Sequence, residues 1–177
     1  NVMRAVAEYA ASVKKALEAG IDAVVVGAGL PLDLPDLAAE HPDALLVPIL
    51  SDARGVQLIV KKWERKKRLP DAIVIEHPGL AGGHLGAARI ADLHDTRFDF
   101  ENVIPASREF LKNAGIEREI PLIAAGGIRS CEDIARLQHL GQVLVPRQDR
   151  DLVTRLAHAG GHGRDQVIGL KAPVRAI

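Results

Sequence analysis

The stretch DAIVIEHPGLAGGHLGAAR, from Asp71 to Arg89, carries the pattern that decides the fold. Residues 72–75 form a continuous apolar run of strand length, and the remainder is rich in glycine and polar residues. An apolar run without alternation predicts a strand that is buried on both faces, as in a parallel sheet covered by helices. The glycine-rich part is longer than most connections in a compact domain, which indicates a functional loop. The stretch therefore predicts a parallel strand whose carboxyl end leads into a site.

Four further apolar runs are spaced along the chain in the same way. They cover residues 23–26, 45–50 and 122–125, with a weaker run at 142–145. Short apolar runs of this length that are bounded by turn residues are typical of buried strands. Pro48 lies inside the second run and has no N–H, so we expect it at a bulge or near the end of its strand.

Apolar residues at helical spacing separate the predicted strands. The first two stripes are Val2, Val6, Tyr9, Val13 and Leu17, and then Val56, Ile59, Val60 and Trp63. We expect further helices at 35–40, at about 102–113 and after Ser130. Ser130 and Asp133 have the spacing of a capping box at the start of the last of these helices, in which we expect Leu137 to face inward.

This alternation leaves two α/β architectures, a (β/α) barrel and a doubly wound open sheet. Functional-looking residues follow three predicted strands, at 27–29, 76–84 and 126–127. In a barrel every strand directs its carboxyl end toward one site, whereas an open sheet gathers its binding residues at a single switch point. We therefore favour a single (β/α) TIM-type barrel domain over residues 1–177. A complete barrel has eight strands, and five predicted strands indicate a partial barrel or an open sheet.

The composition is that of an ordinary globular protein. Hydrophobic residues make up 47% of the 177 residues and charged residues 26%, which excludes an intrinsically disordered chain. Lys plus Arg and Asp plus Glu both total 23, so the net charge gives no reason to expect a nucleic-acid partner. The basic run at 61–68 lacks interleaved aromatics and is explained by a solvated helix end. No apolar run approaches the ~20 residues that cross a bilayer, so we expect no membrane partner.

Cys131 is the single cysteine, which excludes an internal disulfide and predicts a reducing, cytoplasmic environment. It lies in no nucleophile motif, and we expect a buried structural thiol. No spacing of histidine and cysteine in the sequence matches a zinc pattern, so we predict no metal site.

His84 is the candidate catalytic residue. It follows Gly82 and Gly83 in the glycine-rich stretch, and glycines allow the backbone to approach a ligand closely. A histidine in such a loop can exchange protons near neutral pH, so His84 is a candidate general base beside a cofactor. The competing interpretation is a turn with a solvated histidine, and the spacing alone does not separate the two.

Ala125, Gly126 and Gly127 end the run at 122–125 just before a predicted helix. Backbone N–H groups at such a position, together with the positive end of the helix, can hold a phosphate. The alternative is a tight turn, but two adjacent glycines exceed what a turn requires. This turn could hold the phosphate of a cofactor or of a sugar phosphate, and the sequence contains neither a Walker loop nor a dinucleotide fingerprint. The stretch at 27–29 also ends a predicted strand, and it either lines the floor of the site or simply turns the chain.

Four strings together resemble the nitronate monooxygenase family, also called 2-nitropropane dioxygenases. They are GAGLPLDLP (27–35), PILSDARG (48–55), DAIVIEHPGLAGGHLGAAR (71–89) and PLIAAGGI (121–128), and they stand in the family's order within residues 1–141. Related flavin barrels, such as the flavin-type enoyl reductases, share the pattern. The resemblance implies an FMN-containing (β/α) barrel that oxidises alkyl nitronates or nitroalkanes with molecular oxygen.

The resemblance also implies roles for particular residues. His84 matches the family's GGH histidine, the base that removes the α-proton of a neutral nitroalkane. The residues that match positions near the flavin are Asn1, Ser51, Gly82, Gly83, Ala125, Gly126 and Gly127. The cofactor would supply the redox chemistry, and the protein would supply the base and the orientation.

The sequence departs from the family at both ends. The family's first strands have no counterpart before Asn1, so the barrel is expected to be N-terminally truncated. After Gly141 the family's Gly-Thr phosphate contact is missing, and the segment at 142–165 diverges. Two alternative functions therefore stay open: a related reductase of enoyl thioesters, and an inactive truncated barrel that only binds phosphate or a partner.

Overall fold

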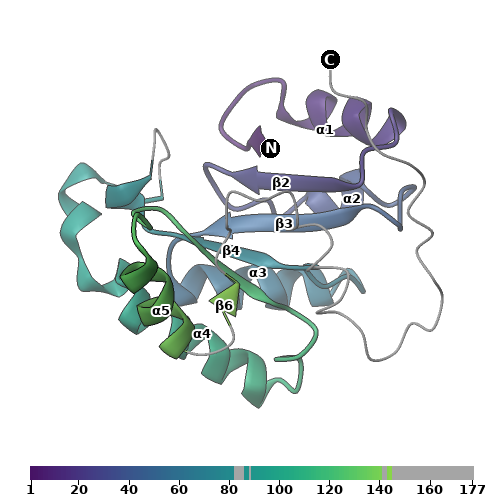
Figure 1. Ribbon diagram of the computed structural model, residues 1–177. Helices are drawn as coiled ribbons and strands as arrows, with labels where there is room; N and C mark the ends of the chain where they lie inside the picture. Colours follow the sequence, from purple (N-terminus) through teal and green to yellow (C-terminus); the bar gives the residue numbers. More distant parts are fainter. Residues whose placement is uncertain (82–85, 88, 141–142, 145–177) are drawn as a thin grey trace.

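The computed structural model describes residues 1–81, 86–87, 89–140 and 143–144, which form six parallel strands and the helices between them (Figure 1). The strands are β1 (Val2–Met3), β2 (Ala23–Gly27), β3 (Leu45–Leu50), β4 (Ile73–Glu76), β5 (Leu122–Ala125) and β6 (Val143–Leu144). The α-helices are α1 (Tyr9–Glu18), α2 (Leu34–Leu37), α3 (Ala53–Glu64), α4 (Phe100–Asn113) and α5 (Cys131–His139). Three 3-10 turns, η1 (Pro78–Leu80), η2 (Ile90–His94) and η3 (Thr96–Phe98), lie between β4 and α4.

The strand order is what separates a barrel from a doubly wound sheet. The six strands lie in the sequential order β1-β2-β3-β4-β5-β6, and every neighbouring pair is parallel. A doubly wound sheet reverses its order at a switch point, and the described strands contain no such reversal. The prediction of parallel strands in a (β/α) barrel arrangement is confirmed, and the chain forms part of such a barrel.

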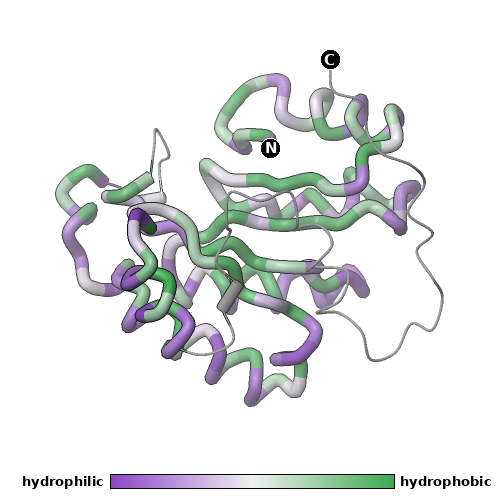
Figure 2. The backbone as a smooth tube through the Cα atoms, viewed as in Figure 1, coloured by the Kyte–Doolittle hydropathy of each residue, from purple (hydrophilic) through white to green (hydrophobic). Residues whose placement is uncertain are grey.

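Alternate residues of the strands pack on two different faces of the sheet. On the helix side lie the strand residues Val24, Val26, Leu46, Leu50, Ile73, Ile75, Leu122 and Ala124, in one core with α1, α3, α4 and α5. On the other side a smaller cluster contains Val47, Ala72 and Ile123, with Val25 and Val74 packed against it. Burial on both faces is why the strands read as continuous apolar runs, whereas the helices mix hydrophobic and hydrophilic residues (Figure 2).

Helix α3 shows how the amphipathic stripe produces the packing. Val56, Ile59, Val60 and Trp63, the residues predicted to form its apolar stripe, are all buried. Each fully buried aliphatic side chain of this kind contributes ~1.5–3 kcal/mol. The indole Nε1–H of Trp63 donates to the Pro31 carbonyl at 3.1 Å, so the buried ring also fixes the loop between β2 and α2.

An ion pair fixes the amino-terminal edge of the sheet, where β3 and β4 begin. The Leu46 N–H donates to Asp71 Oδ2 at 2.8 Å, and Arg68 pairs with the same carboxylate. The Arg68 guanidinium also donates to the Ala44 carbonyl at 3.2 Å. These bonds hold the segment before β4 against the start of β3.

The expectations for Val2 and Cys131 differ from the structure, whereas that for Pro48 agrees with it. Val2 was expected in the first helix, but it forms β1 with Met3, and α1 begins at Tyr9. Pro48 lies near the end of β3, as expected; its pairing with Val26 is the last between β2 and β3, and β3 pairs with β4 from Ile49 onward. Cys131 is exposed rather than buried, because it is the first residue of α5 and lies outside the apolar stripe that includes Leu137.

Candidate functional site

The carboxyl ends of the parallel strands meet at one edge of the sheet. The residues that follow them include Arg4 after β1, Ala28 after β2, Ser51 after β3, His77 after β4 and Gly126 after β5. This edge is where a (β/α) barrel builds its site. The described part of the predicted site therefore lies on one edge of one sheet.

The turn after β5 has the conformation expected of a glycine-built cradle. Gly126 has a φ of 91° and Gly127 a φ of 70°, in the left-handed region that favours glycine. Their N–H groups donate to no other residue that the structure describes. Two adjacent glycines with free N–H groups at a strand end fit the phosphate of a cofactor.

Helix α5 closes its own amino terminus with the predicted capping box. Asp133 Oδ2 accepts the N–H groups of Arg129 and Ser130, both at 3.0 Å, and Ser130 Oγ accepts the Asp133 N–H at 3.1 Å. These N–H donors hold the pKa of the Asp133 carboxyl below its usual value. Because this carboxylate already lies at the helix end, the glycine turn is the better position for a bound anion.

The loop that leaves β4 lies directly on the glycine turn. The His77 N–H donates to the Ala125 carbonyl at 3.3 Å. A β-carbon built on Gly126 would lie 3.5 Å from the carbonyl oxygens of both His77 and Leu80. A β-carbon on Gly127 would lie only 2.5 Å from Leu80 Cδ1. The beginning of the glycine-rich loop and the candidate phosphate turn are therefore in contact.

The other side of the same loop contacts β3. Ser51 is 8% exposed, and a β-carbon on Gly86 would lie 2.2 Å from its Oγ and 2.9 Å from the Cβ of Pro78. Gly86 is a glycine because no side chain fits between Ser51 and Pro78. Ser51, predicted as a flavin contact, is thus found beneath the residue that lies two positions after His84.

The sequence-predicted residues divide into three groups. His84, Gly82 and Gly83 lie outside the described residues. Ser51 and the turn formed by Ala125, Gly126 and Gly127 come together around the described parts of the loop, 77–81 and 86–87. Asn1 is exposed and directly precedes β1, and no described contact joins it to the others.

Arg4, Tyr9 and Asp33 form a polar cluster that the sequence analysis missed. The Arg4 guanidinium lies 4.7 Å from the centre of the Tyr9 ring, and its Nε lies 3.3 Å from Asp33 Oδ1. The burial of Tyr9, followed by the nearby Asp33 carboxylate, raises the pKa of its phenol, so the hydroxyl stays protonated at neutral pH. Only the position of Arg4 after a strand could have signalled this cluster, and that strand was itself not predicted.

Gly86 and Asp99 were also missed. The glycine at 86 could have been singled out, since a glycine outside a turn often marks close backbone approach. No sequence signal connects Asp99 with His77, because the pair forms only when the start of α4 packs beside the end of β4.

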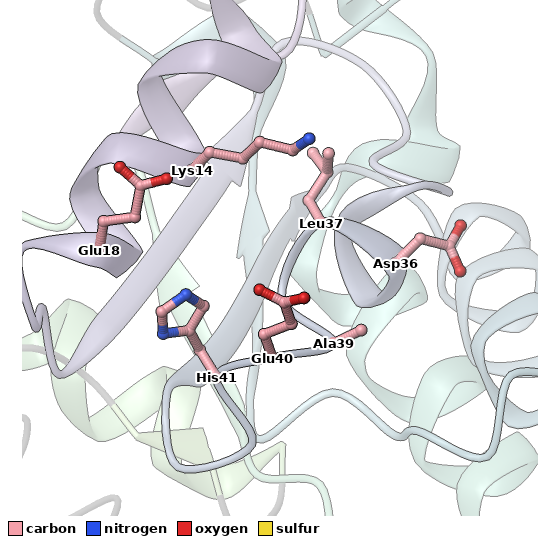
Figure 3. A pocket seen from close by; sticks show the side chains of 7 residues that line it. All are labelled: Lys14, Glu18, Asp36, Leu37, Ala39, Glu40 and His41. Carbon is pink, nitrogen blue, oxygen red and sulfur yellow. The ribbon is translucent and has the colours of Figure 1, made fainter.

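A pocket of about 300 Å³ lies elsewhere, between α1 and α2 (Figure 3). Its lining residues are Lys14, Glu18, Asp36, Leu37, Ala39, Glu40 and His41. None of them is a predicted site residue, and Asp36 also pairs with Lys66. The pocket therefore belongs to the helix layer and not to the strand-end site.

Two kinds of feature are absent from the residues that the structure describes. Among these residues no group of three or more histidine, cysteine, aspartate or glutamate side chains is arranged to hold a metal ion. No helix among them is both long enough and apolar enough to span a membrane.

Comparisons with known proteins give one family and one fold. A family model described as nitronate monooxygenase matches residues 1–156. FabK from Thermotoga maritima is similar in structure, with a TM-score of 0.60 and 21% identity over 82% of this chain and 39% of that one. A nitroalkane oxidase from Streptomyces ansochromogenes has a TM-score of 0.56 and 16% identity over 78% of this chain and 36% of that one. No curated protein matches the chain. The chain spans well under half of the length of both the FabK structure and the nitroalkane oxidase structure.

Proposed function

Because this chain belongs to the nitronate monooxygenase family, a family of flavin-dependent oxidoreductases, we propose that it forms part of an enzyme that oxidises alkyl nitronates and nitroalkanes with molecular oxygen. The observation that supports the proposal best is the contact of the glycine-rich loop with both Ser51 and the turn at Gly126 and Gly127. A base on this loop and a phosphate on this turn would share one strand-end site. The proposal includes a cytoplasmic location, on the ground of the single cysteine.

The cofactor of the proposal is FMN. The N–H groups of Gly126 and Gly127 would hold its phosphate, since positive-φ glycines expose their N–H groups to an anion. Asn1, Ser51, Gly82 and Gly83 would contact the rest of the flavin, and Ala125 would support the turn. When bound, FMN supplies the electron transfer to oxygen.

His84 is the proposed base for neutral nitroalkanes. Such a substrate carries an acidic carbon-bound proton, and this proton would move to a ring nitrogen of His84. A nitronate has already lost that proton, so His84 would not be needed as a base for it. The loop that carries His84 is anchored on both sides, by Leu80 against Gly127 and by Gly86 against Ser51.

The test combines a spectrum with two oxidation assays on the purified protein. We expect visible flavin absorption, release of FMN on denaturation, and oxygen consumption with a small alkyl nitronate. Release of FAD would contradict the cofactor assignment. A protein without flavin would support the alternative of an inactive barrel that binds only phosphate or a partner.

The second candidate function is reduction of an enoyl thioester. It remains a candidate because FabK, an enoyl reductase, shares the fold of this chain. This reaction needs NADH or NADPH as the reductant, and the sequence contains no dinucleotide fingerprint. Oxidation of NADH that depends on an enoyl thioester, without oxidation of nitronates, would establish this function instead.

A further inference from the structure

His77 uses both nitrogens of its ring to hold other parts of the chain. The Gly79 N–H donates to Nδ1 at 3.1 Å, which places the ring proton of the neutral imidazole on Nε2. Nε2 lies 3.5 Å from Asp99 Oδ1, at the start of α4, and the ring meets Phe100 edge-on. The side chain is 15% exposed. A histidine with both nitrogens engaged has none free for a substrate.

The backbone of His77 continues the same connections. Its N–H donates to the Ala125 carbonyl, and its carbonyl accepts the Leu80 N–H at 3.0 Å. That carbonyl also lies 3.5 Å from the place of a β-carbon on Gly126. One residue therefore contacts the end of β5, the start of α4 and the first turn of the glycine-rich loop.

We propose that His77 is a positioning residue that couples the glycine-rich loop to the turn at Gly126 and Gly127. An anion on the N–H groups of this turn would hold it still. The turn would then hold His77 through the bond from its N–H to the Ala125 carbonyl. His77 would hold Gly79 through Nδ1 and Leu80 through its own carbonyl. Phosphate bound after β5 would thus order the first part of the loop that leads to His84. The identity of the anion as the phosphate of FMN rests on the proposed function, whereas the coupling of the loop to the turn through His77 does not.

Three variants separate the contacts of the ring. His77→Ala removes both of them. His77→Asn keeps an oxygen that accepts the Gly79 N–H, because asparagine caps a turn in this way, but it does not reach Asp99. Asp99→Ala removes only the contact with Nε2. His41→Ala, in the pocket between α1 and α2, is the matched control.

The first measurement is amide hydrogen exchange on the protein without flavin. We expect the Gly79 amide, which loses its acceptor Nδ1, to exchange about five- to tenfold faster in His77→Ala, the effect of losing one cap or hydrogen bond, whereas the Leu80 amide keeps its bond to the His77 carbonyl. His77→Asn and His41→Ala should exchange at the wild-type rate at these two amides. Wild-type exchange in His77→Ala would overturn the role of the ring, and thermal unfolding of each variant verifies that it is folded.

The second measurement adds inorganic phosphate and then FMN. In the wild type and in His77→Asn, phosphate should slow exchange at Gly79, Gly126 and Gly127, whereas in His77→Ala it should slow exchange only at the two turn glycines. Equal protection of Gly79 in the wild type and in His77→Ala would overturn the coupling, and so would protection of the two turn glycines alone in the wild type. FMN binding is followed separately by quenching of its fluorescence. Failure of FMN to bind the wild type contradicts the proposed function, while the exchange result still decides the role of His77.

Discussion

The hydroxyl oxygen of Ser51 occupies the space that a side chain on Gly86 would need, 2.2 Å from where its β-carbon would lie. Gly86→Ala should therefore displace the second limb of the glycine-rich loop, lowering FMN affinity and nitroalkane turnover about tenfold or more. Removing the hydroxyl in the double variant Ser51→Gly with Gly86→Ala should restore part of the loss, although Pro78 Cβ at 2.9 Å stays close. Flavin titration of the two single variants and the double variant measures this. Losses that simply add in the double variant would show that the two residues act independently.

Gly127 combines a positive φ with a contact, and the two costs can be separated. In Gly127→Ala the alanine would have to keep a backbone φ of 70°, and its β-carbon would lie 2.5 Å from Leu80 Cδ1. Gly115 has a φ of 75° with nothing within 4 Å, so Gly115→Ala measures the backbone cost alone, about 1–2 kcal/mol. We expect Gly127→Ala to lower the free energy of unfolding by more than Gly115→Ala does. Adding Leu80→Ala to Gly127→Ala should recover only the difference between these two losses. Chemical denaturation of the four proteins is the measurement, and equal losses at the two glycines would disprove the contact.

His84→Asn tests the assignment of the base. General-base catalysis is typically worth ~10²–10⁴-fold, so kcat/KM for a neutral nitroalkane should fall by about that factor. Turnover of the corresponding nitronate should fall much less, because that substrate has no proton left to remove. Both substrates are measured on the same flavin-loaded variant. Equal losses on both would assign His84 to structure or flavin retention instead.

The capping box of α5 predicts a defined pH dependence. The N–H groups of Arg129 and Ser130 lower the pKa of Asp133, so its contribution to stability is present above the unfolded-state pKa. That contribution is lost as the pH falls through the lower, folded-state pKa. Asp133→Asn should therefore be less stable than the wild type at pH 7, and the difference should shrink in acid. Ser130→Ala should cost about 1 kcal/mol at either pH. Denaturation curves at neutral and acid pH test both predictions. A stability difference between Asp133→Asn and the wild type that widens in acid would contradict the first.

Trp63→Phe should destabilise the fold although the new ring is apolar. The indole N–H is the buried donor to the Pro31 carbonyl, and phenylalanine leaves that acceptor unpaired. An unsatisfied buried group costs about 1–3 kcal/mol, to which the smaller ring adds a cavity. Leu58→Ala on the exposed side of the same helix is the control, and it should change the free energy of unfolding by far less. A loss no larger than that of the control would show that the hydrogen bond contributes nothing.

The long strands and helices could be predicted because their local patterns agree with their burial. The runs at 23–26, 45–50 and 122–125 became β2, β3 and β5 almost unchanged. The strand at Val2 and Met3 could not be predicted, because two residues are too few for a period and Val2 also fits the stripe of α1. The sequence also predicts at which strand ends the candidate site lies, since each of these ends is marked by glycine or a polar residue.

The contacts within the site depend on distances between segments that sequence does not encode locally. The glycines at 126 and 127 are predicted from sequence to form a phosphate cradle, but the contact of Leu80 with Gly127 depends on the path of the loop. The pairing of His77 with Asp99 depends in the same way on how α4 docks beside β4. The family resemblance identified positions such as Ser51 but could not show that Ser51 supports Gly86.

The sequential strand order has a consequence for how the molecule assembles. Ala23 pairs with Leu45 and Ile49 with Val74, so each early strand finds its neighbour after one short helical connection. Ile73, by contrast, pairs with Leu122 across the long loop and α4. Closing a longer loop costs more chain entropy and slows pairing. We therefore expect the segment from β2 to β4 to assemble first, as the chain leaves the ribosome, and the junction of β4 with β5 to close last. The candidate site straddles that junction, so it would be completed only at the final step of folding.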